Sequence, residues 1–208
     1  MVERTELERY LSDALCVNQF KDYGPNGLQI EGRGQINRLL VGVTASRALI
    51  EQALDWQADA LLVHHGLFWR GHDGRLTGWL RQRVGLLLGA DLNLFAYHLP
   101  LDAHPEWGNN AALAARLGWR ADECLGEQQL VFAGALPHSL TADGLRLHLQ
   151  STLERPVTLL PGDGRLLRRV AWCTGGAQGY FEAAIAAGVD AFVTGEMSEP
   201  QLHLARET

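Results

Sequence analysis

The chain has 208 residues, of which 47% are hydrophobic and 20% are charged, as in an ordinary compact globular protein. Its formal net charge of -6 argues against broad attraction to nucleic-acid phosphates or anionic lipid. No apolar run approaches the roughly 20 residues that span a bilayer, and the charged start MVERTELERYL lacks a signal-peptide core. We therefore expect a cytoplasmic protein with no membrane partner and no direct nucleic-acid signature.

Residues 1–125 are expected to form a first α/β half. Thr5 and Glu8 have the spacing of a capping box, which predicts a helix at the start of the chain, and a turn rich in Gly and Pro follows at 22–27. The segments INRLLVGVT, SRALIEQALDW and ADALLVHH then predict a strand, a helix and a strand. A further helix, the strand LNLFAYH, the loop LPLDAHPEWGNN and the helix AALAARL complete this half, whose strands should be parallel.

Residues 126–164 are expected to form an α+β insert, in which a helix from about Leu140 lies between the strands QQLVFAGAL and PVTLLPG. Residues 165–208 then begin a second α/β half through RRVAWCTGG, QGYFEAAIAAG and VDAFVTGE. The sequence predicts an α/β fold with two related halves that contain βαβ units with parallel strands. Because the chain stops on a helical pattern without a glycine, we expect the second half to be incomplete at its C-terminus.

The second α/β half resembles the first when the two are laid side by side. Thr44 matches Thr174, and ADALLVHHG matches VDAFVTGEM, so that the histidine pair falls opposite Gly195 and Glu196. Polar residues therefore stand at corresponding strand ends, where binding groups gather in α/β sheets. The likeness indicates either an internal duplication or βαβ architecture alone.

His64 and His65 are adjacent at the end of an apolar run, directly before Gly66. Neighbouring side chains on a strand point to opposite faces, so the two rings can meet only where the strand ends and the backbone turns. Two imidazoles at such an edge are good divalent-metal ligands. The alternative is that one histidine packs under the Leu67–Trp69 cluster while the other faces water.

The next predicted strand end carries more candidate ligands. His98 and Asp102 follow that strand, with His104 and Glu106 in the loop beyond. If the two strands are parallel neighbours, both loops leave from the same edge of the sheet, and Asp102 can reach the imidazoles. A carboxylate with imidazoles suits Zn, Fe, Mn or Ni. We expect His98 to support a metal ligand from behind or to contact the substrate, and the two loop residues to be surface groups.

Two weaker signals lie in the second half. The TGG at 174–176 follows a strand and could cradle an anion, although a close-packed turn explains it better. Glu196 could act as a general acid or base beside a metal, or it could cap the helix that starts near Ser198.

Taken together, these segments resemble the family of GTP cyclohydrolase I type 2 homologues. The resemblance runs through nearly the whole chain and is carried by DYGPNGLQIEG, GVTAS, ADALLVHHG, YHLPLDAHPEWGNNA, RVAWCTGGAQ and VDAFVTGEMSE. It implies a dinuclear metal centre with two divalent ions per subunit, in which His64, His65 and Asp102 occupy three ligand positions. The same resemblance implies that the subunits form a toroidal homohexamer. It also implies a further His and a Glu ligand from a later segment, so we expect this sequence to be a fragment.

Two functions are open at this point. The first is a metal-dependent hydrolase acting on a nucleotide-like or cyclic amide substrate, in which a bound metal activates water while His98 or Glu196 moves protons. The second is a noncatalytic, metal-stabilised hexameric scaffold or interaction protein, for which a role in DNA repair or stress resistance would fit. The first is favoured here because the candidate ligands gather at one predicted sheet edge.

Overall fold

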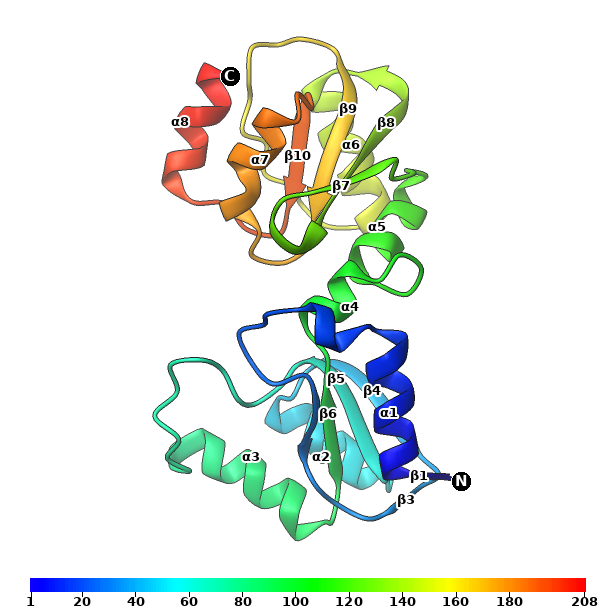
Figure 1. Cartoon of the computed structure of the whole chain (residues 1–208). Coiled ribbons are helices and arrows are strands. Elements are labelled where there is room, and N and C mark those ends of the chain that lie inside the picture. Colours follow the sequence, from blue (N-terminus) through cyan, green and yellow to red (C-terminus); the bar gives the residue numbers. More distant parts are fainter. The chain divides into compact units, whose positions relative to one another are not determined.

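The computed structural model describes residues 1–208 and divides into two compact units, Met1–Leu101 (unit 1) and Asp102–Thr208 (unit 2) (Figure 1). The strands of unit 1 are β1 (Val2–Glu3), β2 (Gly27–Ile30), β3 (Gln35–Ile36), β4 (Leu39–Thr44), β5 (Ala60–His65) and β6 (Asn93–Ala96). Its helices are α1 (Arg4–Ala14), η1 (Val17–Gln19), α2 (Arg47–Asp55) and α3 (Gly78–Gly89), and α4 (Leu99–Ala103) contains the junction between the units.

Unit 2 is also a mixture of strands and helices. Its strands are β7 (Glu123–Leu125), β8 (Val131–Leu140), β9 (Leu167–Cys173) and β10 (Ala191–Thr194). Its helices are α5 (Asn109–Leu117), η2 (Glu127–Gln129), α6 (Ala142–Leu153), η3 (Gln178–Tyr180), α7 (Phe181–Ala186) and α8 (Glu199–Glu207). None of the helices is long and apolar enough to cross a bilayer. The predicted α/β class is confirmed.

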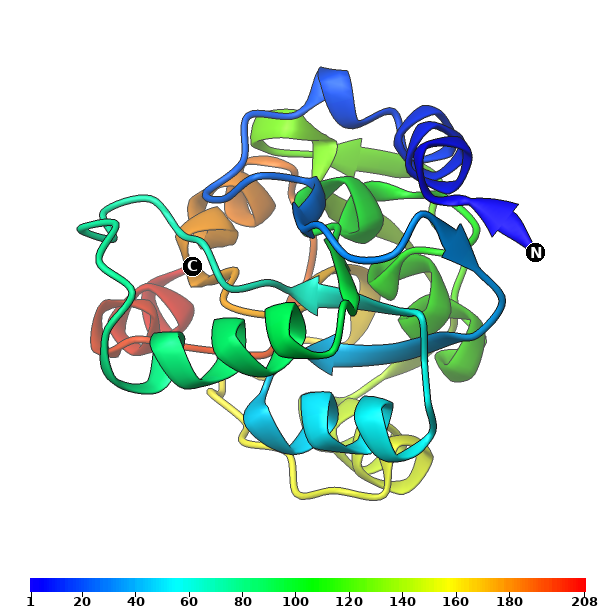
Figure 2. The same cartoon turned by 90° about the horizontal axis from the view of Figure 1, so that it is seen from below.

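The main sheet of unit 1 has the order β2-β6-β5-β4 and is covered by helices on both faces. Strands β4, β5 and β6 are parallel, as predicted, and β2 pairs antiparallel with β6. Because alternate residues face opposite sides, Leu61 and Val63 pack against α2 and α3, whereas Ala60 belongs to the cluster that α1 joins. Figure 2 shows α1 on one side of the sheet and α2 and α3 on the other. This packing brings β5 and β6 side by side, with their carboxyl ends at one edge.

The predicted capping box at the start of α1 is wrong. The helix begins at Arg4 after the N-cap residue Glu3, so Thr5 and Glu8 both lie inside it. The short strand β1 pairs with β3 immediately before the helix and so fixes where the helix can start. Glu8 instead accepts a hydrogen bond from the backbone N–H of Leu28, at 3.0 Å, and thereby joins α1 to β2.

The sheet of unit 2 has the order β10-β9-β8-β7. Strands β9 and β10 are parallel, and β8, which comes from the predicted α+β segment, pairs antiparallel with β9. The strand predicted at 156–162 is wrong, because no strand forms there. Pro156 and Pro161 flank this stretch and lack the backbone N–H that a ladder needs. Val157 of this stretch still packs against the core of unit 2.

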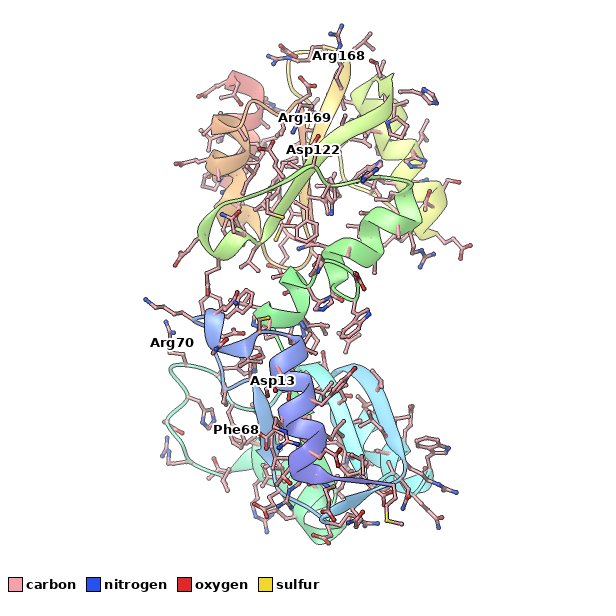
Figure 3. All side chains as sticks on the ribbon, turned by 45° about the vertical axis from the view of Figure 1, so that its right-hand side comes forward. Asp13, Phe68, Arg70, Asp122, Arg168 and Arg169 are labelled. Carbon is pink, nitrogen blue, oxygen red and sulfur yellow. The ribbon has the colours of Figure 1, made fainter.

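That core is built on Trp172 of β9, which is fully buried. Its ring lies 5.3 Å from the ring of Trp119 and 6.1 Å from that of Phe132, measured between centroids. Helices α5 and α6 contribute the leucines and alanines around it. At the surface, the guanidinium of Arg169 contacts the carboxylate of Asp122 at 2.9 Å, and Figure 3 labels this pair.

The two units have the same pattern of hydrogen bonds at the start of a pair of parallel strands. In unit 1 the carboxylate of Asp59, just before β5, accepts the backbone N–H groups of Asn37 and Arg38 at 2.8 and 2.9 Å. In unit 2 the carboxylate of Asp190, just before β10, accepts those of Arg168 and Arg169 at 2.7 and 2.9 Å. The backbone N–H of Asp59 also donates to the backbone carbonyl of Arg38, and that of Asp190 donates to the carbonyl of Arg169. A shared βαβ architecture does not require this detail, so it supports the internal duplication.

Asp59→Ala is expected to lower the free energy of unfolding by about 2 kcal/mol near neutral pH, because two backbone N–H groups and the guanidinium of Arg33 lose their acceptor. Burial would raise the pKa of Asp59, but the hydrogen bonds from Asn37, Arg38 and Arg33 outweigh it and lower the pKa. A carboxyl with a depressed folded pKa stabilises the fold above its unfolded pKa, and this contribution is lost as the pH falls through the folded pKa. The gap between wild type and variant should therefore shrink below about pH 4.

Urea denaturation near neutral pH and below about pH 4 measures the difference in the free energy of unfolding between wild type and Asp59→Ala. Asp55→Ala, at an exposed position of α2, is the matched control and should cost less than about 0.5 kcal/mol. Equal losses for the two variants would contradict the role given to Asp59.

Candidate metal centre

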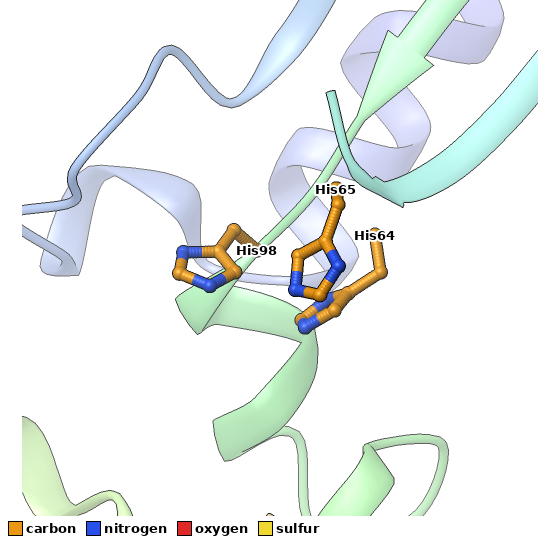
Figure 4. A group of neighbouring side chains, drawn as sticks. All are labelled: His64, His65 and His98. Carbon is orange, nitrogen blue, oxygen red and sulfur yellow. The ribbon is translucent and has the colours of Figure 1, made fainter. Parts of the chain in front are cut away.

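Three histidines of unit 1 gather at the carboxyl edge of its sheet. His64 and His65 are the last two residues of β5, and His98 lies just after β6 (Figure 4). One ring nitrogen from each lies within 4.8 Å of the other two. The ring centroids of His64 and His65 are 4.5 Å apart, and that of His98 is 4.9 and 5.6 Å from them. The predicted convergence of the adjacent pair is confirmed, and His98 joins it.

Each of the three rings is held through its Nδ1 atom. Nδ1 of His64 lies 3.1 Å from the carbonyl oxygen of Tyr97, which can only accept, so this nitrogen carries the proton. Nδ1 of His65 lies 3.3 Å from the hydroxyl of Thr44 on β4. Nδ1 of His98 lies 2.7 Å from a carboxylate oxygen of Asp22. A neutral imidazole that donates from Nδ1 has its lone pair on Nε2, the form in which histidine binds metals.

Gly66 ends the histidine strand and lets another segment approach it. A Cβ at this position would collide with Oε1 of Gln29. That oxygen accepts the backbone N–H of Leu67 at 2.8 Å, while the amide nitrogen of Gln29 donates to the carbonyl of Pro25 at 2.9 Å. Gln29 therefore ties the turn after the histidine pair to the turn at 22–27.

The turn at 22–27 also holds His98. The first residue of this turn is Asp22, whose side chain is only 3% exposed. Burial alone would raise the pKa of Asp22, but hydrogen bonds from His98, Asn26 and the backbone of Leu99 and Tyr23 lower it to about 2. The side-chain oxygen of Asn26 accepts the backbone N–H of His98 at 2.7 Å. Both the ring and the backbone of His98 are thus fixed by this turn.

A small, partly open hollow lies between the turn and the histidines. It is lined by Gly24, Pro25, Asn26, Gln29, His64, Gly66, Phe68, Trp69, Ala96 and His98. Imidazole nitrogens are suitable donors for Zn, Fe, Mn or Ni. The residues present therefore fit a divalent metal ion.

Asp102, the predicted carboxylate ligand, lies on α4 as the first residue of unit 2. It is 8% exposed, and its Oδ1 accepts hydrogen bonds from Asn109 at 2.7 Å and from the hydroxyl of Thr174 at 3.4 Å. Burial and the charge of Asp102 raise the pKa of the Cys173 thiol to about 12. In the metal-free protein Cys173 therefore stays protonated at neutral pH. The assignment of Asp102 as a ligand to the histidine-bound metal stays a prediction.

Glu196 and the TGG segment lie together in unit 2. A Cβ on Gly176 would be 3.2 Å from Oε2 of Glu196, so the absence of a side chain there makes room for the carboxylate. The alternative that Glu196 caps the following helix is wrong, because the N-cap of α8 is Ser198, which is paired with Gln201. The catalytic role of Glu196 stays a prediction.

Of the loop residues, His104 stacks on Trp107 with their ring centroids 4.5 Å apart. Its Nδ1 accepts the backbone N–H groups of Glu106 and Trp107, which gives it a local structural role. Sequence reasoning missed Asp22, Asn26 and Gln29 as supports of the histidines. Asp22 and His98 are 76 residues apart in the chain, so no local spacing could reveal their pairing.

The chain is similar to known proteins over almost its entire length. A protein from Neisseria meningitidis serogroup A, named GTP cyclohydrolase 1 type 2 homolog, is 49% identical over 100% of this chain and 84% of its own length. A protein of the same name from Yersinia pestis is 50% identical over 99% of this chain and 83% of its own. The solved structure of the protein ybgI, described as of unknown function, matches with a TM-score of 0.94 and 43% identity over 99% of this chain and 83% of that one.

The family resemblance noted from the sequence motifs is therefore confirmed by relatives that match almost the entire chain. The model of the family described as Duf34/NIF3 (NGG1p interacting factor 3) matches residues 2–208, which include every candidate site residue discussed above. This chain belongs to the Duf34/NIF3 family.

Proposed function

We propose that this protein is a metal-dependent hydrolase that acts on a nucleotide-like or cyclic amide substrate. The observation that carries the proposal is the cluster of His64, His65 and His98, each held at Nδ1 by a separate partner. Such fixed imidazoles favour binding of a divalent ion over a surface role. A divalent ion, once bound, supplies Lewis acidity and activates water near neutral pH.

In this proposal His64 and His65 hold the metal, and Asp102 supplies the carboxylate ligand. His98 completes the imidazole cluster, where its Nε2 can bind the ion or accept a proton from substrate or water. Glu196, which is exposed at the end of β10, is assigned proton transfer to the leaving group. The hydrogen bonds from Asn109 and Thr174 hold Asp102 in one orientation.

The substrate class rests on the printed name of the relatives, which points to GTP as the first compound to assay. We expect turnover by protein loaded with Zn²⁺ or Mn²⁺, loss of that turnover after chelation, and recovery when the metal is restored. The assay panel should contain GTP, other phosphorylated nucleosides and cyclic amides, with product formation followed by chromatography. Absence of metal-dependent turnover on the whole panel would contradict the hydrolase proposal.

A second candidate is a noncatalytic, metal-stabilised scaffold that forms a homohexamer. This candidate is favoured by two exposed apolar residues on the edge strand β4. Val41 is 65% exposed and Val43 is 67% exposed. Exposed apolar side chains beside unpaired strand edges are suited to association. For this function, chelation should change the mass measured by light scattering while no compound in the panel is turned over.

A further inference from the structure

The carboxylate of Asp22 is surrounded by hydrogen-bond donors. Its Oδ1 accepts from the backbone N–H of Tyr23 at 2.6 Å and lies 2.7 Å from Nδ1 of His98. Its Oδ2 accepts from the side-chain amide of Asn26 and from the backbone N–H of Leu99, both at 2.9 Å. The orientation of the Asn26 amide is fixed independently, because its oxygen accepts the backbone N–H of His98.

This environment determines which nitrogen of His98 carries the proton. A carboxyl group that receives two backbone N–H groups and an amide N–H is stable only in its ionised form, which accepts and cannot donate. Nδ1 of His98 must therefore donate to Asp22. In the neutral ring the lone pair is then on Nε2, the nitrogen on the other side of the ring from Asp22.

We propose that Asp22 is a positioning residue that fixes the orientation and the Nδ1–H tautomer of His98, so that Nε2 of His98 is presented to the cluster with His64 and His65. The tautomer follows from the hydrogen bonds alone. Its consequence for metal binding rests on the proposed function. A carboxylate behind a histidine also raises the basicity of the opposite nitrogen, which favours either metal binding or proton acceptance.

Asp22→Asn tests this role with almost no change of shape. The new NH₂ group must face either Nδ1 of His98 and the N–H of Tyr23, or the N–H groups of Asn26 and Leu99. In each orientation a donor of the new amide would face another hydrogen-bond donor. In the first orientation His98 has to accept at Nδ1 and shifts to the Nε2–H tautomer. In the second a neutral oxygen replaces the charged acceptor at Nδ1, which weakens the preference for the Nδ1–H tautomer and lets the Nε2–H form become populated.

Nitrogen-15 NMR of the histidine rings in the metal-free protein distinguishes the two tautomers at about pH 8.5, where an ordinary imidazole is neutral. We expect wild type to show His98 as Nδ1–H, and Asp22→Asn to show the Nε2–H form or a mixture. Asp13→Asn, at an exposed position of α1, is the matched control and should leave the His98 signals unchanged. An Nε2–H form of His98 in wild type would overturn the proposal without any variant, and so would an unchanged tautomer in folded Asp22→Asn.

Zn²⁺ titration of the same proteins measures the consequence for binding. Loss of an outer hydrogen-bond partner typically weakens metal affinity by about 10- to 100-fold, and we expect a loss in this range for Asp22→Asn and none for Asp13→Asn. If wild type does not bind Zn²⁺ but the tautomer shifts as expected, the proposed function fails and the positioning role of Asp22 stands. If wild type binds Zn²⁺ and Asp22→Asn binds equally well, Asp22 has no positioning role toward the metal.

Discussion

His65→Ala is expected to weaken Zn²⁺ binding by more than the roughly 100-fold that loss of an outer hydrogen-bond partner can cost, because it removes one of the imidazoles itself. His65 is half-buried at the end of β5, and its Nδ1 is held by Thr44. Titration with Zn²⁺ in competition with a chromogenic chelator gives the affinity, and elemental analysis gives the number of ions bound. Zn²⁺ should also raise the melting temperature of wild type and leave that of the variant nearly unchanged.

His138→Ala is the matched control for this experiment, because His138 is an exposed residue of β8 in unit 2. It should bind Zn²⁺ as wild type does. If His65→Ala bound the same number of ions with unchanged affinity, the histidine cluster would not be the metal site.

Trp172→Ala is expected to lower the free energy of unfolding of unit 2 by about 3 to 5 kcal/mol, the usual cost of deleting a large aromatic side chain from a core. Trp172 is 0% exposed and packs against Trp119 and Phe132. Its indole N–H also donates to the carbonyl of Asn110 at 3.0 Å, so the variant leaves a buried acceptor without this donor. Urea denaturation followed by circular dichroism measures the shift of the transition.

Trp107→Ala makes the same chemical change at a residue that is 56% exposed, and it should cost less than about 1 kcal/mol. Because the chain has two compact units, the urea curve is to be fitted with separate transitions for them. A loss for Trp172→Ala no larger than that for Trp107→Ala would contradict the placement of Trp172 at the centre of the core.

The parts of the fold that could be predicted from sequence are those set by local pattern. The alternation of apolar strands with a helix gave the parallel arrangement of β4 and β5, and the stop at Gly66 indicated why two neighbouring imidazoles could meet. The strand predicted at 156–162 does not form because Pro156 and Pro161 lack the backbone N–H that a ladder needs, and Val157 packs against the core without a ladder partner.

The supports of the candidate site could not be predicted because they are long-range hydrogen bonds. The turn at 22–27 has the composition of a turn, and that composition does not reveal that its Asp22 holds His98 or that Gln29 holds the segment after the histidine pair. These contacts depend on how β2 and its preceding turn lie beside β6, which is a property of the folded sheet.

Asp59 and Asp190 anchor the amino ends of β5 and β10, whereas the residues with distinctive chemistry stand at the opposite ends of the same strands. The full length of each strand therefore separates the anchoring aspartate from the residues with distinctive chemistry. A mutation at the far end leaves the anchor intact, so β5 can end in His64 and His65 while β10 is followed by Gly195 and Glu196. Residues at these carboxyl ends can therefore differ between the two units without loss of the anchored strand pair.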